Sequence, residues 1–380
     1  MNRTKVRLAV VGCGVISDIY FENMKNRFSI LEVAGCCDLN PAAAQRTAEK
    51  FEIPVLSMEE ILADETIELV VNLTPPGAHH GVIKQALLAG KHVYTEKPLA
   101  VSFAQGEELA ALADARKLRL CAAPDTFLGA AAQTARFAVD SGLIGEVTSC
   151  VATLNRDGGW MAEKYPYTAG PGGGIGTDVG IYYVTVLLSL LGPVGEVCGF
   201  WDTLRPRRSH YSLAREEWGR EYRIESENLV SAAFRFQSGA YGNLHLNANS
   251  TQNEAPQIIL YGSEGMLFLP DPNGFGGEVR VQLKGQKESF ALPHTHAFAE
   301  NSRGLGVAEM AWALRNGREP RASKEMALHG VELLLGIQES AQSKRFYELR
   351  STFARPAPLP RGYLDRGYSN ADPENGLAIP

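Results

Sequence analysis

A glycine-rich turn near the amino terminus constrains the fold of this chain more than any other feature. The segment Gly12-Cys13-Gly14-Val15-Ile16-Ser17 follows a short apolar run, Val6 to Val11, and precedes a segment with helical character, Ser17 to Lys25. A strand, a glycine turn and a helix in this order are the context that a dinucleotide-binding fingerprint requires. The sequence therefore predicts an α/β fold whose parallel sheet begins with this unit.

Each small residue of the turn has a physical role. Gly12 permits the tight turn, and Gly14 lets the backbone of the turn, with Val15 and Ile16 beside it, approach a pyrophosphate at the positive end of the helix. Ser17 replaces the third glycine of the fingerprint and is still small enough for close packing of helix and strand. Glycines at a strand end are often only a turn, so this motif needs support from elsewhere in the chain.

Support comes from an acidic residue at the end of the next apolar run. Leu31 to Cys37 reads as a strand, and Asp38 follows it. A carboxylate there accepts hydrogen bonds from the two hydroxyls of an adenosine ribose and repels a 2′-phosphate, which favours NAD over NADP. Arg46 would relax that preference. Taken alone, a turn or cap role before Pro41 explains Asp38 about as well.

Length, composition and charge limit the class of protein. At 380 residues, and with roughly 150 residues per domain, the chain has room for two domains. Hydrophobic residues make up 45% of it, and the net charge is −6 with no long block of like charge. Neither a nucleic acid nor an anionic membrane is therefore expected as a partner, and a small molecule is the expected ligand.

The cysteines and the apolar stretches predict a cytoplasmic protein. Six cysteines, at positions 13, 36, 37, 121, 150 and 198, show no C-x-x-C spacing and fall mostly in apolar runs, as buried reduced thiols do. Gly12 and Gly14 interrupt the first apolar run, which argues against a signal peptide. The stretch from Val179 to Leu191 is shorter than the roughly 20 residues that span a bilayer, so we read it as a buried helix.

The hydrophobic pattern changes near residue 124. Before it, short apolar runs alternate with helical segments, which predicts a doubly wound parallel sheet. The expected strands are Val6–Val11, Leu31–Cys37, Glu68–Leu73, His92–Thr95 and Leu118–Cys121, and helices are expected at Pro41–Phe51 and Gly81–Ala89. After a helix at Gly129–Ser141, strands predict a mainly antiparallel sheet: Glu146–Asn155, Leu229–Gln237, Gly239–Ala248, Gln257–Tyr261, Met266–Pro270 and Glu278–Leu283. Helices at Leu305–Asn316 and Lys324–Ser343 follow.

Several motifs together resemble one family of proteins. They are Gly12-Cys13-Gly14, Thr74-Pro75 followed by His79, Ala89-Gly90-Lys91-His92-Val93 running into Glu96-Lys97-Pro98, and Gly172-Gly173-Gly174 with Asp178 and Gly180. From about residue 5 to 345 the sequence resembles the Gfo/Idh/MocA family of oxidoreductases. The run into Glu96-Lys97-Pro98 is much more specific than the glycine turn.

The resemblance implies an architecture, a substrate class and further cofactor contacts. It implies an NAD(P)-binding Rossmann domain in residues 1–123 and a substrate-binding α/β domain in 124–350, whose large open sheet carries a homodimer or homotetramer interface; an extended tail, 351–380, follows. Family members mostly oxidise or reduce a carbinol on a sugar, inositol or related ring. Thr74, Pro75, His79 and Glu96 resemble cofactor-side positions, although Pro76 stands where relatives often have asparagine and His79 also fits a helix cap.

Lys97 is the candidate acid or base. Oxidising an alcohol sends a hydride to the nicotinamide and requires the protein to remove the hydroxyl proton. A lysine at the carboxyl end of a parallel strand points into the crevice where open sheets bind ligands. We expect partial burial and the positive nicotinamide ring to lower the pKa of Lys97 toward neutrality. Without the family match, a surface lysine beside Glu96 would be the better interpretation.

Asp178 and Tyr182 complete the candidate catalytic group. They are four residues apart, so in a helix that begins after the glycine run they share one face. Many family members place a histidine where Tyr182 stands, whereas relatives that resemble sugar oxidoreductases and dihydrodiol dehydrogenases have tyrosine. A phenol near Lys97 would relay or donate the proton, and Asp178 would accept a substrate hydroxyl. A purely structural role for Tyr182 in anchoring a buried helix is the alternative.

Two more segments contain candidate ligand residues. The loop from Arg156 to Pro171 carries Trp160, Tyr165 and Tyr167 beside polar groups, a composition suited to stacking on a sugar ring and equally to ordinary packing; Arg156 and Trp160 join Lys97, Asp178 and Tyr182 as proposed substrate contacts. His294 and His296 alternate as in a strand before Asn301-Ser302-Arg303-Gly304, near the substrate cleft. No third ligand accompanies them, so no metal site is expected.

Three functions fit these residues. The leading hypothesis is an NAD(P)-dependent dehydrogenase or reductase of a sugar, glycoside or cyclic polyol. An NAD-dependent glycosidase that oxidises a ring carbon transiently would retain its cofactor and release no NADH. A non-catalytic NAD or sugar sensor on the same fold would have no need of Lys97 and Tyr182, so their presence argues against it.

Overall fold

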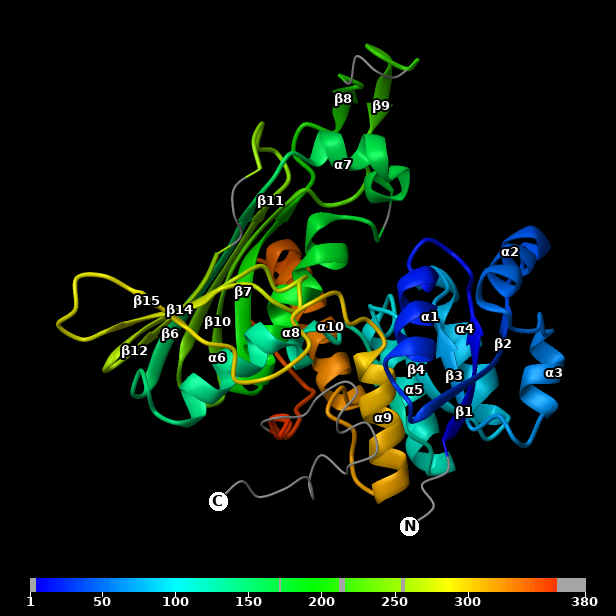
Figure 1. The fold of residues 1–380 in the computed structure, drawn as a ribbon. Helices are drawn as coiled ribbons and strands as arrows, with labels where there is room; N and C mark the ends of the chain where they lie inside the picture. Colours follow the sequence, from blue (N-terminus) through cyan, green and yellow to red (C-terminus); the bar gives the residue numbers. More distant parts are fainter. Residues whose placement is uncertain (1–4, 171, 212–215, 254–256, 361–380) are drawn as a thin grey trace.

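Two large sheets of different type form most of the molecule. The computed structural model describes residues 5–170, 172–211, 216–253 and 257–360. A parallel sheet with its helices occupies one side of the molecule, and a larger, strongly twisted sheet occupies the other (Figure 1). This is the two-sheet α/β architecture expected from the hydrophobic pattern, and the division of the chain at residue 123 is the one that we propose.

The parallel sheet has the strand order β2-β1-β3-β4-β5. Its strands are β1 (Val6–Val11), β2 (Leu31–Cys37), β3 (Leu69–Asn72), β4 (His92–Thr95) and β5 (Leu120–Ala122), and its helices are α1 (Ser17–Asn26), α2 (Pro41–Phe51), α3 (Met58–Ala63), α4 (Pro76–Leu88) and α5 (Phe103–Arg116). All four strand pairs are parallel. The order reverses between β1 and β3, and ligands bind at the carboxyl ends of strands at such a point.

The second sheet has nine strands in the order β15-β14-β13-β12-β6-β11-β10-β7-β16. They are β6 (Val147–Asn155), β7 (Val194–Asp202), β10 (Leu229–Phe236), β11 (Tyr241–Asn247), β12 (Gln257–Gly262), β13 (Gly265–Leu269), β14 (Val279–Leu283), β15 (Phe290–Leu292) and β16 (Tyr347–Glu348). Only β6 and β11 pair in parallel; the other neighbours are antiparallel. The sheet is thus mainly antiparallel, as expected.

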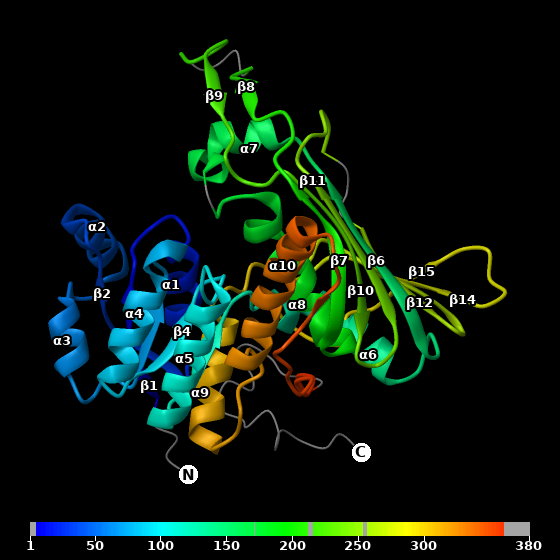
Figure 2. The ribbon, with the colours of Figure 1, turned by 180° about the vertical axis from the view of Figure 1, so that it is seen from behind.

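Helices cover one face of the large sheet and connect it to the parallel sheet. They are η1 (Thr126–Leu128), α6 (Ala130–Asp140), α7 (Gly158–Lys164), η2 (Pro166–Ala169), η3 (Ile175–Val179), α8 (Gly180–Leu191), α9 (Leu305–Asn316) and α10 (Lys324–Ser343). Residues 180–190 of α8 are all buried, which confirms the buried helix. Figure 2 shows α10 between α5 and the large sheet, and it contacts both α5 and β7.

The structure differs from the sequence-based elements in a few places. Helix α4 begins at Pro76, five residues before the expected start, because Pro75 and Pro76 fit its first turn. Strand β7 lies inside the large sheet but was not expected, since Gly195 and Gly199 interrupt its apolar pattern; a Cβ at Gly199 would lie 2.6 Å from a backbone oxygen of β10. Helices α3 and α5 lie between expected strands, as the alternating pattern predicts, whereas α7, β15 and β16 were not predicted.

A small projection extends from the large sheet beside α7. Strands β8 (Arg207–Ser209) and β9 (Glu221–Arg223) form their own two-stranded antiparallel ladder. In Figures 1 and 2 they lie beyond α7, at the top of each view. A two-stranded ribbon is only marginally stable by itself, so α7 and the sheet support it.

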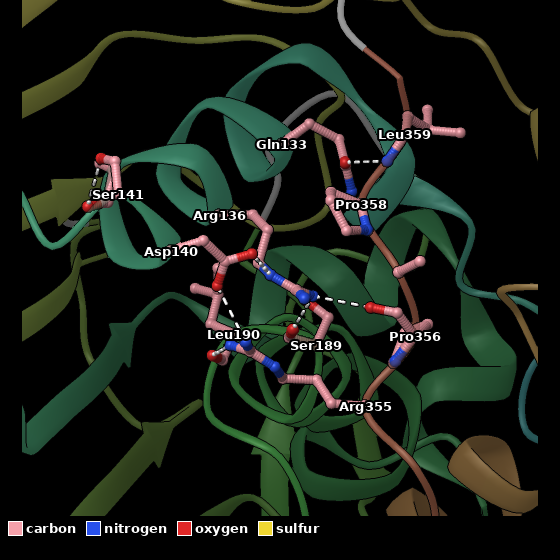
Figure 3. Close-up of polar contacts among 12 residues, drawn as sticks. Gln133, Arg136, Asp140, Ser141, Ser189, Leu190, Arg355, Pro356, Pro358 and Leu359 are labelled. Carbon is pink, nitrogen blue, oxygen red and sulfur yellow. Dashed lines mark hydrogen bonds and ion pairs between the residues drawn. The ribbon is translucent and has the colours of Figure 1, made fainter. Parts of the chain in front are cut away.

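The chain after Thr352 contains no helix or strand up to residue 360, but it is bound along its length. Arg136 of α6 donates to Ser189 O at 2.8 Å and to Pro356 O at 2.9 Å. Leu359 N donates to Gln133 Oε1 at 2.8 Å, and Leu359 is 2% exposed (Figure 3). The first part of the expected tail is therefore a strap across α6 and α8; residues 361–380 lie outside the described residues.

The structure also describes the cysteines, the apolar helices and the two histidines of the sequence analysis. All six cysteines are free, four of them buried. Within the described ranges no helix is long and apolar enough to cross a membrane, and no group of three or more His, Cys, Asp or Glu side chains has the arrangement of a metal site. The proposed strand through His294 and His296 is wrong, because β15 ends at Leu292. His296 is instead buried, with Nε2 2.8 Å from Leu359 O.

Candidate active site

The glycine turn lies at the carboxyl end of β1 with an open outer face. Gly12 has a φ of +103°, and a Cβ there would lie 2.6 Å from the carbonyl carbon of Leu73. A Cβ at Gly14 would meet no atom within 4 Å. Ser17 Oγ donates to Gly14 O at 2.7 Å where α1 begins, and Val15 is 92% exposed. An open glycine before a helix amino terminus fits a pyrophosphate.

Asp38 is held against this turn. Its Oδ2 accepts from Cys13 N at 2.7 Å, and its Oδ1 accepts from Asn40 N at 2.7 Å. Asn40, not Asp38, caps α2 through its own side chain. Arg46 Nη2 reaches Cys13 O at 3.5 Å. A carboxylate and a guanidinium thus both contact the backbone of Cys13, in the middle of the turn.

Thr74 and Pro75 form the turn between β3 and α4. Thr74 Oγ1 donates to Asn72 Oδ1 at 2.7 Å. His79 is fully buried; its Nε2 lies 2.8 Å from Thr74 O and its Nδ1 2.7 Å from Pro98 O. Burial lowers the pKa of His79. The imidazole ties two strand ends together, so it affects the proposed cofactor site through Thr74 and Pro98.

Glu96 uses both oxygens of its carboxylate inside the protein. Tyr20 Oη, from α1, donates to Oε1 at 2.7 Å, and Lys97 N donates to Oε2 at 3.0 Å. Tyr20 is fully buried. The sequence analysis did not single out Tyr20, because a tyrosine on the inner face of a helix looks like a core residue. Glu96 therefore orients the strand end that carries Lys97.

Lys97 contacts both of its expected partners. The Nζ of Lys97 lies 2.5 Å from Asp178 Oδ1 and 2.8 Å from Asp178 O. It also lies 5.3 Å from the centre of the Tyr182 ring, within the range of a cation–π contact. The Lys97 and Asp178 side chains are 14% and 16% exposed. A residue just after β4, one from η3 and one from α8 thus meet between the parallel sheet and the large sheet.

The charge state of Lys97 differs from the expectation. Burial acts to lower its pKa, as expected, but the nearby oxygens of Tyr182, Asp178 and Glu96 outweigh burial and raise the pKa above its usual value. Lys97 is therefore an ammonium at neutral pH in this structure. Burial raises the pKa of Tyr182, and the charges of Lys97 and Arg303 oppose that rise. Tyr182 is a neutral phenol at neutral pH.

Asp178 owes its position to a π-helical turn. η3 (Ile175–Val179) is a π-helix, a rare form that is common at functional sites. Glu227 Oε1 holds this turn by accepting from Thr177 N at 2.7 Å and from Thr177 Oγ1 at 2.8 Å. A Cβ at Gly176 would lie 2.5 Å from the Trp201 ring. Asp178 and Tyr182 therefore lie on successive helical elements and still converge on Lys97.

Arg303 approaches Tyr182 from the segment before α9. Its Nη1 donates to Asn301 Oδ1 at 2.8 Å, and its Nη2 donates to Asn273 Oδ1 at 2.7 Å. Burial acts to lower its pKa, but the nearby Tyr182 hydroxyl, to which it donates, raises the pKa overall. The sequence predicts that the segment Asn301–Gly304 lies near the cleft, but it does not identify Arg303 as a neighbour of Tyr182.

The two remaining substrate candidates lie in different surroundings. Arg156 follows β6, and Asp178 is the strongest opposite charge acting on it. Trp160 lies on α7, 45% exposed, with Lys164 Nζ 4.9 Å from the centre of its ring. The structure brings Arg156 toward the Lys97 group, and it leaves Trp160 on the α7 surface.

Comparison with known proteins agrees with this geometry. Residues 6–123 match the model of an oxidoreductase family with an NAD-binding Rossmann fold, and residues 132–268 match the Gfo/Idh/MocA C-terminal domain. The chain belongs to the Gfo/Idh/MocA family of oxidoreductases. Its glycine turn and parallel sheet are therefore the NAD-binding part of the family fold.

Similar proteins bear oxidoreductase names. An uncharacterized oxidoreductase C115.03 of Schizosaccharomyces pombe is 29% identical over 49% of this chain, which spans only 52% of that relative. The dTDP-3,4-didehydro-2,6-dideoxy-alpha-D-glucose 3-reductase of Actinomadura kijaniata is 26% identical over 91% of this chain and 98% of its own.

A solved structure shares the whole fold. The crystal structure of a putative NADPH-dependent oxidoreductase from Desulfitobacterium hafniense superposes with a TM-score of 0.77 at 21% identity, covering 91% of this chain and 98% of its own. At this identity the likeness concerns the fold alone.

Proposed function

We propose that this chain is an NAD-dependent dehydrogenase or reductase that moves a hydride between the nicotinamide and a carbinol or carbonyl carbon of a sugar, glycoside or cyclic polyol. The observation that carries the proposal is the meeting of Lys97, Asp178 and Tyr182 at the carboxyl end of β4, beside the glycine turn of an NAD-binding fold. The sugar reductase named above supports the substrate class.

The residues that would hold the cofactor form one edge of the parallel sheet. Gly12, Gly14, Val15 and Ile16 would bind the pyrophosphate at the start of α1, and Asp38 would accept from the ribose hydroxyls. Thr74, Pro75, Glu96 and Lys97 would line the side toward the nicotinamide. His79 would hold this side in place through its contacts with Thr74 O and Pro98 O. Arg46 beside the turn leaves use of NADP open.

The charge states give Lys97 and Tyr182 separate roles. NAD, when bound, supplies the site that accepts or donates the hydride. In the reduction direction the Lys97 ammonium donates a proton to the carbonyl oxygen, and Tyr182 supplies a second donor. In the oxidation direction Lys97 must first lose its proton, after which it accepts the hydroxyl proton. Asp178 holds the Lys97 ammonium in place and accepts a neighbouring substrate hydroxyl.

The open face of the large sheet is the proposed subunit interface. Phe200 of β7 and Tyr241 of β11 are 70% and 59% exposed there. Exposed aromatic side chains are enriched where subunits meet. A homodimer or homotetramer through this face would give a molecular mass in sedimentation that is two or four times that of the chain, and Phe200→Asp would lower it.

Nicotinamide absorbance tests the activity directly. Wild type, Lys97→Met and the exposed-lysine control Lys84→Met are assayed with NAD and NADP on aldoses, inositols, glycosides and their keto forms. Wild type and Lys84→Met are expected to turn over at least one member, and Lys97→Met to lose roughly 10²- to 10⁴-fold in kcat.

The alternatives give different results in the same assay. A glycosidase would release an aglycone from a glycoside without net NADH, and Lys97→Met would abolish that release. A sensor would bind NAD and sugar, and Lys97→Met would change no reaction. Equal turnover by wild type and Lys97→Met would overturn the proposed role of Lys97.

A further inference from the structure

Arg156 is a half-buried cation whose guanidinium includes a buried nitrogen without a hydrogen-bond partner among the described residues. This nitrogen is Nε, which is shielded from solvent and bonds to nothing among the described residues. The backbone of Arg156 is fixed, because its N donates to Asn247 O at 2.9 Å at the end of β6. The side chain therefore projects from a rigid strand end rather than from a loose loop.

Such an arrangement is costly in the unliganded protein. A buried polar group without a partner loses its hydration and gains nothing in exchange. Burial accordingly lowers the pKa of Arg156, and the charges of Asp178 and Asp271 only partly oppose this. A second buried donor lies in the same surroundings, since Tyr183 Oη also has no partner and its pKa responds to the charge of Arg156. Two unused donors are in place for an acceptor that the protein does not supply.

The neighbouring charges limit what that acceptor can be. Lys97 and Asp178 neutralise each other, and Arg303 bonds to the neutral amides of Asn273 and Asn301. Arg156 is thus left with one positive charge, while Asp178 and Asp271 both act on it. These carboxylates repel any anion, and they would repel a dianionic phosphate about twice as strongly as a monoanion. A single planar carboxylate matches both the charge and the two-pronged geometry of a guanidinium.

We infer that the substrate carries a carboxylate, which binds the Arg156 guanidinium with help from Tyr183 while its carbinol or carbonyl lies at Lys97 and Tyr182. The inference rests on the proposed function for the position of the reacting carbon, but not for the anion contact itself. The substrate class is then a sugar acid, such as a uronate or aldonate, rather than a neutral sugar.

Binding of matched acid and amide pairs tests this directly. D-glucuronate, D-galacturonate and D-gluconate are titrated by calorimetry against their neutral amides, with and without NADH. In wild type at least one acid is expected to bind roughly 10- to 100-fold more tightly than its amide, the range for a hydrogen-bonded charge pair. Arg156→Met should bring this ratio close to 1, Arg156→Lys should leave part of it, and Arg207→Met, at an exposed arginine of β8, should leave it unchanged.

Every outcome bears on the inference. If no acid binds better than its amide in wild type, or if Arg156→Met and Arg156→Gln keep the preference while folded by circular dichroism, the carboxylate site is wrong. Arg156-dependent binding of dTDP-glucose without any acid preference would assign the site to a diphosphate instead. An acid preference without any hydride transfer would support the inference and reject the proposed activity, so the two are judged separately.

Discussion

Asp178 holds Lys97 through two atoms, its carboxylate Oδ1 at 2.5 Å and its backbone oxygen at 2.8 Å from the Lys97 Nζ. Asp178 lies in the π-helical turn η3, and both of these atoms face the Lys97 amine that follows β4. The Asp178 backbone oxygen thus holds the Lys97 amine in position, and the Asp178 carboxylate stabilises its positive charge. Substitutions at Asp178 can separate the two effects.

Replacing Asp178 by asparagine should shift the pH dependence of reduction. The variant keeps the backbone contact but loses a carboxylate that helps to raise the pKa of Lys97. Reduction needs the Lys97 ammonium, so wild type should keep its activity to high pH, and the loss of activity in Asp178→Asn should begin at lower pH. We expect kcat to fall roughly 10²-fold as well. Initial rates from pH 6 to 11 measure both, with Asp202→Asn as control. An unchanged alkaline limb would rule out this role for Asp178.

Replacing Tyr182 by phenylalanine should slow the chemical step more than it weakens binding. The ring that faces the Lys97 ammonium remains, so Lys97 keeps its position. Only the hydroxyl is lost, and we expect kcat to fall roughly 10- to 10²-fold with a smaller change in KM. Tyr182→His, which introduces the residue common in the family, should recover part of kcat. If Tyr182→Phe matches wild type, Tyr182 serves only to pack α8.

Much of this site could be predicted because its residues follow strand ends. Gly12, Asp38 and Thr74 each come directly after a short apolar run, and Lys97 comes two residues after the run that ends at Thr95. Parallel strands bring such positions to one edge. The Glu96-Lys97-Pro98 motif likewise predicted Lys97, and the four-residue spacing from Asp178 predicted Tyr182 as its neighbour on a helix. Position along the chain sufficed for these residues.

The residues that sequence reasoning missed reach the site through tertiary packing. Tyr20 and Arg303 come from α1 and from the segment before α9, and nothing in their local pattern separates them from ordinary core and surface residues. The raised pKa of Lys97 was missed for the same reason, because it depends on how close Asp178 lies. The sequence did not predict strand β7, because two glycines interrupt the alternation of apolar and polar residues along it.

The preference between NAD and NADP should depend on the charge of Asp38. Asp38→Asn keeps an oxygen that can accept from Cys13 N, but it removes the repulsion of a 2′-phosphate. We expect the ratio of kcat/KM for NADP to that for NAD to rise roughly tenfold or more. Adding Arg46→Ala should reverse part of this gain, because Arg46 reaches the same turn. Steady-state kinetics with both cofactors measure the ratio, and an unchanged ratio in Asp38→Asn would refute a ribose-binding role.

Asp125 should make the stability of the protein depend on pH. It is 1% exposed, and burial raises its pKa from 3.8 to about 6, although its Oδ2 accepts from Gly304 N at 3.0 Å and Gly306 N at 2.9 Å. The folded protein therefore binds this proton more tightly than the unfolded chain does. The resulting stabilisation is complete below pH 3.8 and is lost as the pH rises through about 6, by about 3 kcal/mol in total.

Asp125→Asn isolates this effect. Both amide bonds end on a single oxygen, so the asparagine Oδ1 can keep them while the charge is removed. His329, whose pKa burial lowers to about 4, changes stability in the opposite sense over the same range, but it does so equally in both proteins. The free energy of unfolding of Asp125→Asn minus that of wild type should therefore rise by about 2 kcal/mol between pH 4 and 7. Urea titrations at each pH measure it, and parallel curves for the two proteins would show that Asp125 is already ionised when folded.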